Sequence, residues 1–212
     1  MKIIMEAKKI SELLESVRLR GRYFDGVESK ISELSPYAYM SLNGQILEVW
    51  NADNTTVCGI RETIEGDELE NGIAVLDIKK TVNYLKGFND EVTFEANDFL
   101  YISDDSSFET KLHVYASDLS KATNGCDVIN TARYKFDYNE TFKMSTIRND
   151  LDKYETEITL ITSDGEPSTV EFTGFFHGFF NTVLNIYLKD EAPVLFVSPN
   201  RILLKAPYLD RG

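Results

Sequence analysis

Residues 72–87 have the sequence GIAVLDIKKTVNYLKG, in which a strand pattern runs directly into a helix pattern. The apolar run Ile73–Leu76 predicts a buried strand. Asp77 follows as the N-cap of a helix, because its carboxylate can accept hydrogen bonds from the free N–H groups of a first helical turn. Apolar residues then recur every three to four positions, which predicts a helix over Asp77–Phe88 that stops at Gly87.

Two further segments have helical periodicity. In Lys8–Arg22 the apolar residues stand at i, i+3, i+4 and i+7 from Ile10, and Gly21 follows as the expected end of the helix. In Asn139–Tyr154 the apolar residues recur at three-to-four spacing from Met144. The sequence therefore predicts three helices.

Most of the remaining chain alternates β-branched or aromatic residues with polar ones between Asn, Asp and Gly turns, which is typical of strands. We therefore predict an α+β fold, mostly antiparallel, with few helices on many strands. The predicted strands are Lys2–Ala7, Gln45–Val49, Thr56–Thr63, Glu91–Glu95, Phe99–Ser103, Phe108–Val114, Glu157–Ile161, Thr169–Thr173, Val183–Leu188 and Val194–Val197.

The alternating pattern is interrupted once, where Ala, Ser, Asp, Asn and Gly predominate. This predicts a connector over residues 115–130, between a first domain at 1–114 and a shorter second domain at 131–212. The first domain repeats a strand–helix–strand unit, once around the first helix and once around the second.

The composition excludes several classes of protein. The 212 residues carry 22 Lys and Arg against 35 Asp and Glu, a formal net charge of −13, and include 13 Phe and 11 Tyr. So many aromatic residues exclude intrinsic disorder, and two cysteines, Cys58 and Cys126, are too few for a disulfide scaffold or a four-ligand zinc site. The N-terminus has no secretory pattern and no window is apolar enough to span a membrane, so we expect a cytoplasmic protein.

We find no constellation of residues typical of catalysis, and we expect no enzyme activity, no cofactor and no bound metal. His113 and His177 have no Cys, His or acidic neighbour at ligand spacing. Asp104 and Asp105 precede two serines, as in a solvated turn. The sequence has no glycine-rich phosphate loop, nucleophile elbow or HExxH motif.

The basic residues are concentrated in the three predicted helices, which hold eleven of the 22 against six acids. The helices therefore carry a net charge of +5 and the rest of the chain −18. One interpretation is a shared phosphate-facing surface; the other is that Lys and Arg form helices well and normally occupy exposed faces. The eleven residues are Lys8, Lys9, Arg18, Arg20, Arg22, Lys79, Lys80, Lys86, Lys143, Arg148 and Lys153.

With these features, the sequence resembles the DNA sliding clamps, the ring-shaped polymerase processivity factors of the PCNA type, including phage versions. The resemblance rests on the duplicated strand–helix–strand plan, the acidic bulk with basic helices, and the order and spacing of several short motifs. These motifs are Asn43–Leu47, Trp50–Val57, Gly72–Lys86, Glu91–Phe94, Phe99–Ile102, Glu191–Phe196 and Leu203–Pro207.

The resemblance implies a ring of three identical chains, joined head to tail, with the helices lining a channel for double-stranded DNA. The joint would pair an edge strand of the first domain, here Phe108–Val114, with one of the second domain. A clamp loader would place the ring on DNA. The implied DNA-facing residues are Lys8, Lys9, Arg18, Arg20, Lys79, Lys80, Lys86, Lys143, Arg148 and Lys153.

The resemblance also implies that DNA polymerase attaches through a short peptide, which binds an apolar pocket beneath the connector. The alternative role for each pocket residue is ordinary packing within a strand or core. The matching positions are Trp50, Val57, Leu119, Pro193, Leu204, Ala206, Pro207 and Tyr208.

The second half departs from the family pattern, because five phenylalanines crowd into Phe172–Phe180 where the family has further strands and a fourth helix. For Phe176–Phe180, a remnant of that helix, a strand of the core and an exposed subunit contact are all open. Two other functions also remain open. One is a clamp-fold protein that closes no ring, as a monomeric or dimeric scaffold or a DNA mimic. The other is an α+β enzyme with an unrecognised site. The small size favours a phage protein, which would act in the host cytoplasm.

Overall fold

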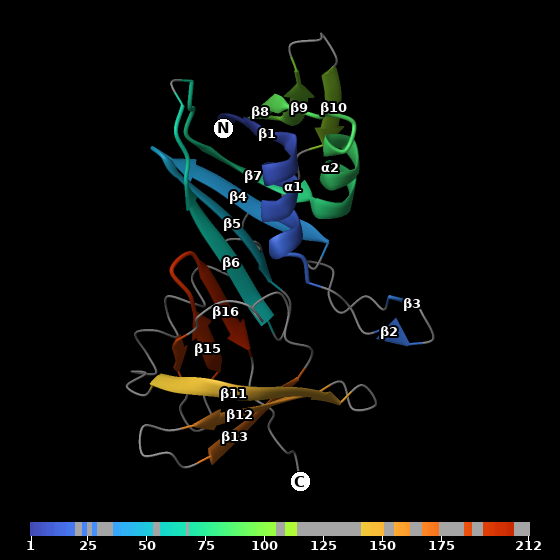
Figure 1. The fold of residues 1–212 in the computed structure, drawn as a ribbon. Coiled ribbons are helices and arrows are strands. Elements are labelled where there is room, and N and C mark those ends of the chain that lie inside the picture. Colours follow the sequence, from blue (N-terminus) through green and yellow to red (C-terminus); the bar gives the residue numbers. More distant parts are fainter. Residues whose placement is uncertain are drawn as a thin grey trace.

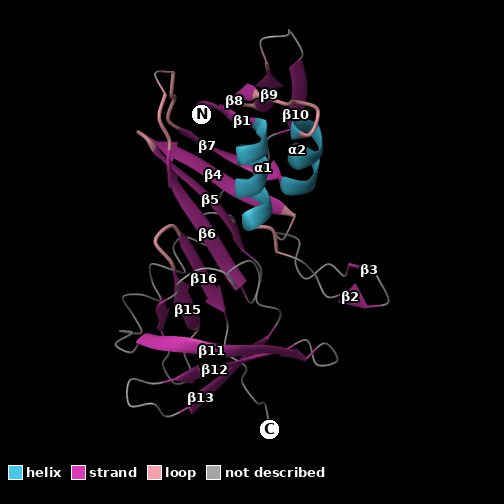
Figure 2. Cartoon of the chain, in the orientation of Figure 1, coloured by secondary structure: helices cyan, strands magenta, loops and turns pink. Residues whose placement is uncertain are grey.

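The computed structural model describes residues 1–19, 23–24, 27–28, 36–52, 56–66, 68–104, 109–113, 141–150, 155–161, 167–173, 185–187 and 193–205. Two helices and sixteen strands lie within these ranges (Figures 1 and 2). The elements of the first 113 residues are β1 (Lys2–Glu6), α1 (Ala7–Ser16), β2 (Tyr23–Phe24), β3 (Val27–Glu28), β4 (Tyr37–Asn43), β5 (Ile46–Ala52), β6 (Thr56–Thr63), β7 (Gly72–Asp77), α2 (Ile78–Leu85), β8 (Glu91–Ala96), β9 (Phe99–Ser103) and β10 (Glu109–His113).

The rest of the described chain consists of strands. They are β11 (Thr141–Asp150), β12 (Glu155–Ile161), β13 (Pro167–Thr173), β14 (Asn185–Tyr187), β15 (Val194–Val197) and β16 (Arg201–Lys205). Each of the ten predicted strands overlaps an observed one, and the fold is α+β and antiparallel as expected.

The strands form a four-stranded sheet in the order β1-β8-β9-β10 and a ten-stranded sheet in the order β13-β12-β11-β14-β15-β16-β6-β5-β4-β7. A two-stranded ribbon, β2-β3, stands apart from both. The ten-stranded sheet contains strands from both predicted domains, because β16 pairs with β6 in antiparallel register. The connector at 115–130 lies outside the described residues, so the domain boundaries stay a prediction.

The two helices contact each other and lie against the sheets (Figure 2). Their apolar residues belong to one core, which also takes in side chains of both sheets. Ile10, Leu13 and Leu14 of α1 are buried there, as predicted, and so are Val82 and Leu85 of α2. Because this face of each helix is committed to the core, the polar residues of both helices face outward.

Helix α2 begins as its sequence predicts. The side chain of Asp77 accepts a hydrogen bond from the backbone N–H of Lys80 over 2.9 Å. At the other end, the N–H of Gly87 donates to the carbonyl of Tyr84 over 3.0 Å, within the predicted boundary.

Helix α1 is shorter than predicted. It ends at Ser16, with Val17 as C-cap, and the prediction that it continues to Arg22 with Gly21 at its end is wrong. The Ser16 hydroxyl donates to the carbonyl of Leu13, and the N–H of Arg18 donates to the carbonyl of Glu15, so local bonds satisfy the last turn. Val17 is also a poor helix former because its β-branch restricts χ1.

The third predicted helix is wrong, since Thr141–Asp150 forms strand β11, paired with β12 and β14. The strand has a bulge between Met144 and Thr146. Met144 is therefore paired with Leu160, and Ile147 with Ile158. Leu160 and Ile158 are two residues apart, so they lie on one face of β12. The extra residue gives a strand the three-residue apolar spacing that otherwise indicates a helix.

The N-cap of α2 can be tested by Asp77→Ala. We expect the free energy of unfolding to fall by ~1 kcal/mol, because an orphan N–H of the first turn loses its acceptor. Urea denaturation followed by circular dichroism measures this change. Asp77→Asn is the matched control, since its amide oxygen still accepts the bond; a loss as large as that of the alanine variant would contradict the capping role.

Candidate functional site

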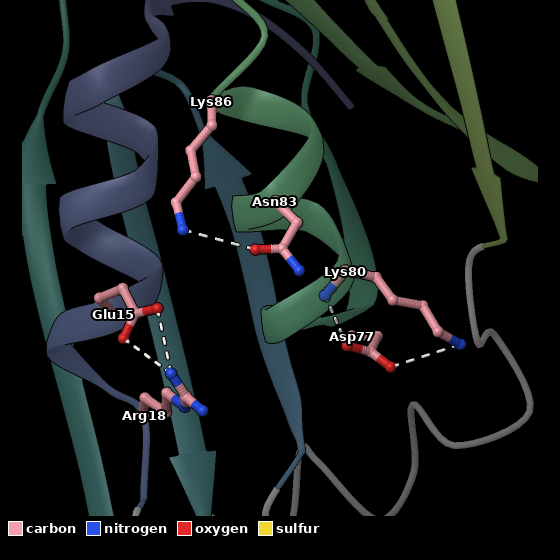
Figure 3. Close-up of polar contacts among 6 residues, drawn as sticks. All are labelled: Glu15, Arg18, Asp77, Lys80, Asn83 and Lys86. Carbon is pink, nitrogen blue, oxygen red and sulfur yellow. Dashed lines mark hydrogen bonds and ion pairs between the residues drawn. The ribbon is translucent and has the colours of Figure 1, made fainter.

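The outward face of α2 carries lysines with little acidic compensation. Lys79, Asn83 and Lys86 are exposed and recur at four- and three-residue spacing, so they form one stripe. Lys86 Nζ lies 3.5 Å from Asn83 Oδ1, and Figure 3 shows the two side chains pointing toward each other. At ~1.5 Å per residue, Lys79 and Lys86 are about 10 Å apart along the helix axis. Lys80, by contrast, has an acidic partner, because its Nζ lies 3.5 Å from Asp77 Oδ2.

Helix α1 balances its own charges. Its two lysines are matched by Glu12 and Glu15, whereas α2 holds two lysines and no acid. Lys8 Nζ lies 3.9 Å from Glu12 Oε1, on a pair that is largely exposed. Arg18, just after the helix, lies 3.3 Å from Glu15 Oε1 (Figure 3). The positive potential of the helix pair is therefore stronger at α2.

The structure brings part of the predicted DNA-facing set together. Lys8, Lys9, Lys79, Lys80 and Lys86 are all exposed on the helix pair, and half-buried Arg18 lies beside its end.

The remaining members lie elsewhere. Lys143 and Arg148 were expected on a helix, but they stand on strand β11 because the third helix does not form. Arg20 and Lys153 lie outside the described residues. The described part of the helical surface is thus built from α1 and α2.

A second apolar cluster lies on the opposite face of the ten-stranded sheet. The residues of this cluster alternate with residues of the helix-side core along β4, β5, β6 and β16. Because successive side chains of a strand point to opposite faces, the cluster and the core lie on opposite faces of the sheet. We call it the outer cluster. Its buried members are Tyr39, Trp50, Val57, Val75, Leu195 and Leu204.

Trp50 lies flat against the strand beside it. It is paired in register with Gly59, and a Cβ at Gly59 would lie 2.1 Å from Trp50 Cε3. The absence of a side chain at Gly59 therefore makes room for the indole. Trp50 Nε1 is buried, with no hydrogen-bond partner among the described residues.

Three of the predicted pocket residues meet in the outer cluster: Trp50, Val57 and Leu204. Pro193 stands half-buried just before β15. The rest of the predicted set, Leu119, Ala206, Pro207 and Tyr208, lies outside the described residues. Tyr39, Val75 and Leu195 also belong to the outer cluster; they are outside the predicted set, although the alternation in β4, β7 and β15 indicates this face for them.

Trp50, Val57 and Leu204 are at most 7% exposed, so a partner would first contact the rim of the outer cluster. The rim consists of partly buried apolar residues packed against the cluster. They are Tyr37, Ala52, Tyr187, Val197 and Ile202.

Four strands stand at the ends of the two sheets in the described part of the chain: β1 and β10, and β13 and β7. β10 is the last strand of the four-stranded sheet and β13 the last of the ten-stranded sheet. A sheet edge carries N–H and C=O groups that can pair with another chain. The predicted joint strand, Phe108–Val114, coincides with β10.

The described residues hold no group of three or more His, Cys, Asp or Glu side chains placed to bind a metal ion. Neither α1 nor α2 is long and apolar enough to span a membrane. Away from the helix pair, Lys2 Nζ donates to Glu68 over 2.7 Å. This bond raises the pKa of Lys2 and lowers that of Glu68.

Comparison with solved structures identifies the fold. The chain matches solved structures of sliding clamps and beta clamps over its whole length, at a probability of 1.00. The chain has the sliding-clamp fold. The similar structures include a DNA polymerase sliding clamp from Pseudomonas aeruginosa, with a TM-score of 0.64 and 12% identity, matched over 100% of this chain and 65% of that one.

Two further structures agree. A putative DNA polymerase III beta subunit from Eubacterium rectale gives a TM-score of 0.63 at 15% identity, over 100% of this chain and 66% of the other. The Helicobacter pylori beta clamp bound to a DNA ligase peptide gives 0.60 at 10% identity, over 100% and 67%. The chain with the sliding-clamp fold thus spans about two thirds of their length. No protein-family model and no curated protein sequence matches it.

The packing of Trp50 can be tested by Gly59→Ala. The new methyl group overlaps the indole, so the ring must move, and overpacking of this kind costs about 1–3 kcal/mol of unfolding free energy. Urea denaturation measures the loss, and the emission maximum of Trp50, the single tryptophan, reports the displacement.

Gly66→Ala is the control for this substitution, because a Cβ there meets Leu69 Cδ2 at an ordinary 3.6 Å. If Gly59→Ala changes stability and emission no more than Gly66→Ala, the indole does not lie over Gly59.

Proposed function

We propose that this protein is a DNA sliding clamp, a non-enzymatic processivity factor that encircles double-stranded DNA and tethers DNA polymerase. The supporting observation is the exposed face of α2, where Lys79 and Lys86 have no acidic partner among the described residues on a chain with the sliding-clamp fold. Lysines that contact phosphates bind DNA without reading its sequence. A ring held on DNA by its closed shape needs only weak contacts of this kind, and weak contacts allow sliding.

The proposal includes a ring of three chains, joined through β10 of one chain and β13 of the next. Both are edge strands, and two such edges can pair as in a continuous sheet. The acidic balance of the chain outside its helices repels DNA from the outer surface. A clamp loader opens the ring, and the protein acts in the cytoplasm, that of the host if a phage encodes it.

The proposal also assigns polymerase binding to the outer cluster, on the sheet face opposite the helices. This face carries an aromatic and aliphatic rim, which suits the apolar side chains of a short peptide. DNA and polymerase would then contact opposite faces of the same sheet.

Charge reversal on α2 tests the DNA-facing role. We expect Lys79→Glu with Lys86→Glu to lower stimulation of the polymerase on primed circular DNA at least tenfold, since two phosphate contacts become repulsive. The control is Lys2→Glu with Arg61→Glu, which makes the same charge change away from the helix pair. Equal stimulation by the two double variants would contradict the assignment of α2 to the DNA channel.

Ring closure has a separate test. Sedimentation on primed circular DNA should detect a species of three 24.1 kDa chains, which linearisation of the DNA releases because only a closed ring is held topologically. A mass of one or two chains on DNA would favour the scaffold without a closed ring.

A further inference from the structure

Lys205, the last residue of β16, is a buried lysine whose role the proposed function leaves open. It is 2% exposed, and its Nζ donates to Thr56 Oγ1 over 2.9 Å. Thr56 is the first residue of β6, and the two residues form the last pair of the β16–β6 register. The bond therefore ties the end of the C-terminal strand to the point where the chain enters β6.

The surroundings of Lys205 differ from the rest of that sheet face. By strand alternation, Lys205 and Thr56 stand on the face of Leu203 and Cys58, which both belong to the apolar core. Asn51, also buried, stands on the same face of neighbouring β5. A buried ammonium is costly unless it is hydrogen-bonded, and Lys205 can make its bond to Thr56 only while β16 is paired with β6.

The outer cluster begins one residue away. Leu204 is opposite Val57, and both contribute to the cluster that contains Trp50. Fraying of β16 at Lys205 would therefore withdraw Leu204 from the face that carries Trp50. Ala206, Pro207 and Tyr208, which the resemblance to sliding clamps implies in partner binding, follow Lys205 in the sequence.

We infer that Lys205 is a positioning residue for partner binding: by bonding Thr56 it holds the end of β16 on β6, and so orders the outer cluster. The partner is a peptide with apolar side chains, and in this respect the inference rests on the proposed function. Lys205 itself stands on the opposite face and acts through Leu204.

The fluorescence of Trp50 tests the positioning role in the full chain, without DNA or polymerase. Lys205→Met keeps an unbranched side chain but removes the ammonium group, and Thr56→Val keeps the shape of threonine but removes the hydroxyl. We expect each to raise the acrylamide quenching constant of Trp50 at least twofold under native conditions. Thr56→Ser, which keeps the acceptor hydroxyl, should behave like the wild type.

A purely structural role predicts a different result. In that case the variants would lower the melting temperature but leave quenching in the folded state unchanged, and that outcome would overturn the inference. If Lys205→Met does not fold, Thr56→Val decides the question by the same measurement.

Polymerase stimulation tests the link to partner binding. We expect Lys205→Met to raise the chain concentration for half-maximal stimulation at least fivefold, with the maximum unchanged and the mass on DNA unaltered. If the half-maximal concentration is unchanged, the inference about Lys205 is overturned and the proposed function is not. A wild-type chain that gives no stimulation would overturn the proposed function, and with it the partner half of the inference.

Discussion

The structure depends on the alternation of side chains along β4, β5, β6 and β16. Successive side chains of a strand point to opposite faces, so these strands bury one set under the helices and the other around Trp50. A register slip of one residue would exchange the two sets and place Met40 and Val49 on the wrong face. A sheet that is buried on both faces therefore has a strongly specified register, and the two candidate surfaces are positioned by the same constraint.

Burial of the helix stripes also decides where the charges stand. Once Val82 and Leu85 are committed to the core, Lys79 and Lys86 have only the outer surface of α2 available. The same burial in α1 exposes a surface on which glutamates neutralise lysines. In the proposed ring, DNA would thus meet an uneven inner wall, with stronger attraction at α2. The overall charge of −13 conceals this local arrangement.

Local sequence predicted the elements that are encoded by neighbouring residues. Helix α2 follows from the Asp77 cap and the spacing of its apolar residues, and ten strands follow from two-residue alternation. Strand β11 was missed because a bulge near Ser145 breaks the alternation, and the resulting spacing imitates a helix. The end of α1 was missed because bonds from Ser16 and Arg18 close its last turn five residues before Gly21.

Residue patterns were enough to indicate the fold class, the core faces of both helices and the basic surface of α2, and the resemblance to sliding clamps indicated three members of the outer cluster. Which strands are neighbours depends on the folded chain. Thr56 and Lys205 are 149 positions apart, yet their side chains bond because β16 pairs with β6. Periodicity tells which face of a strand is buried, but strand partners are chosen by long-range packing and register. For this reason only the folded chain shows that Leu204 and Trp50 belong to one cluster, and that Lys205 is buried beside it.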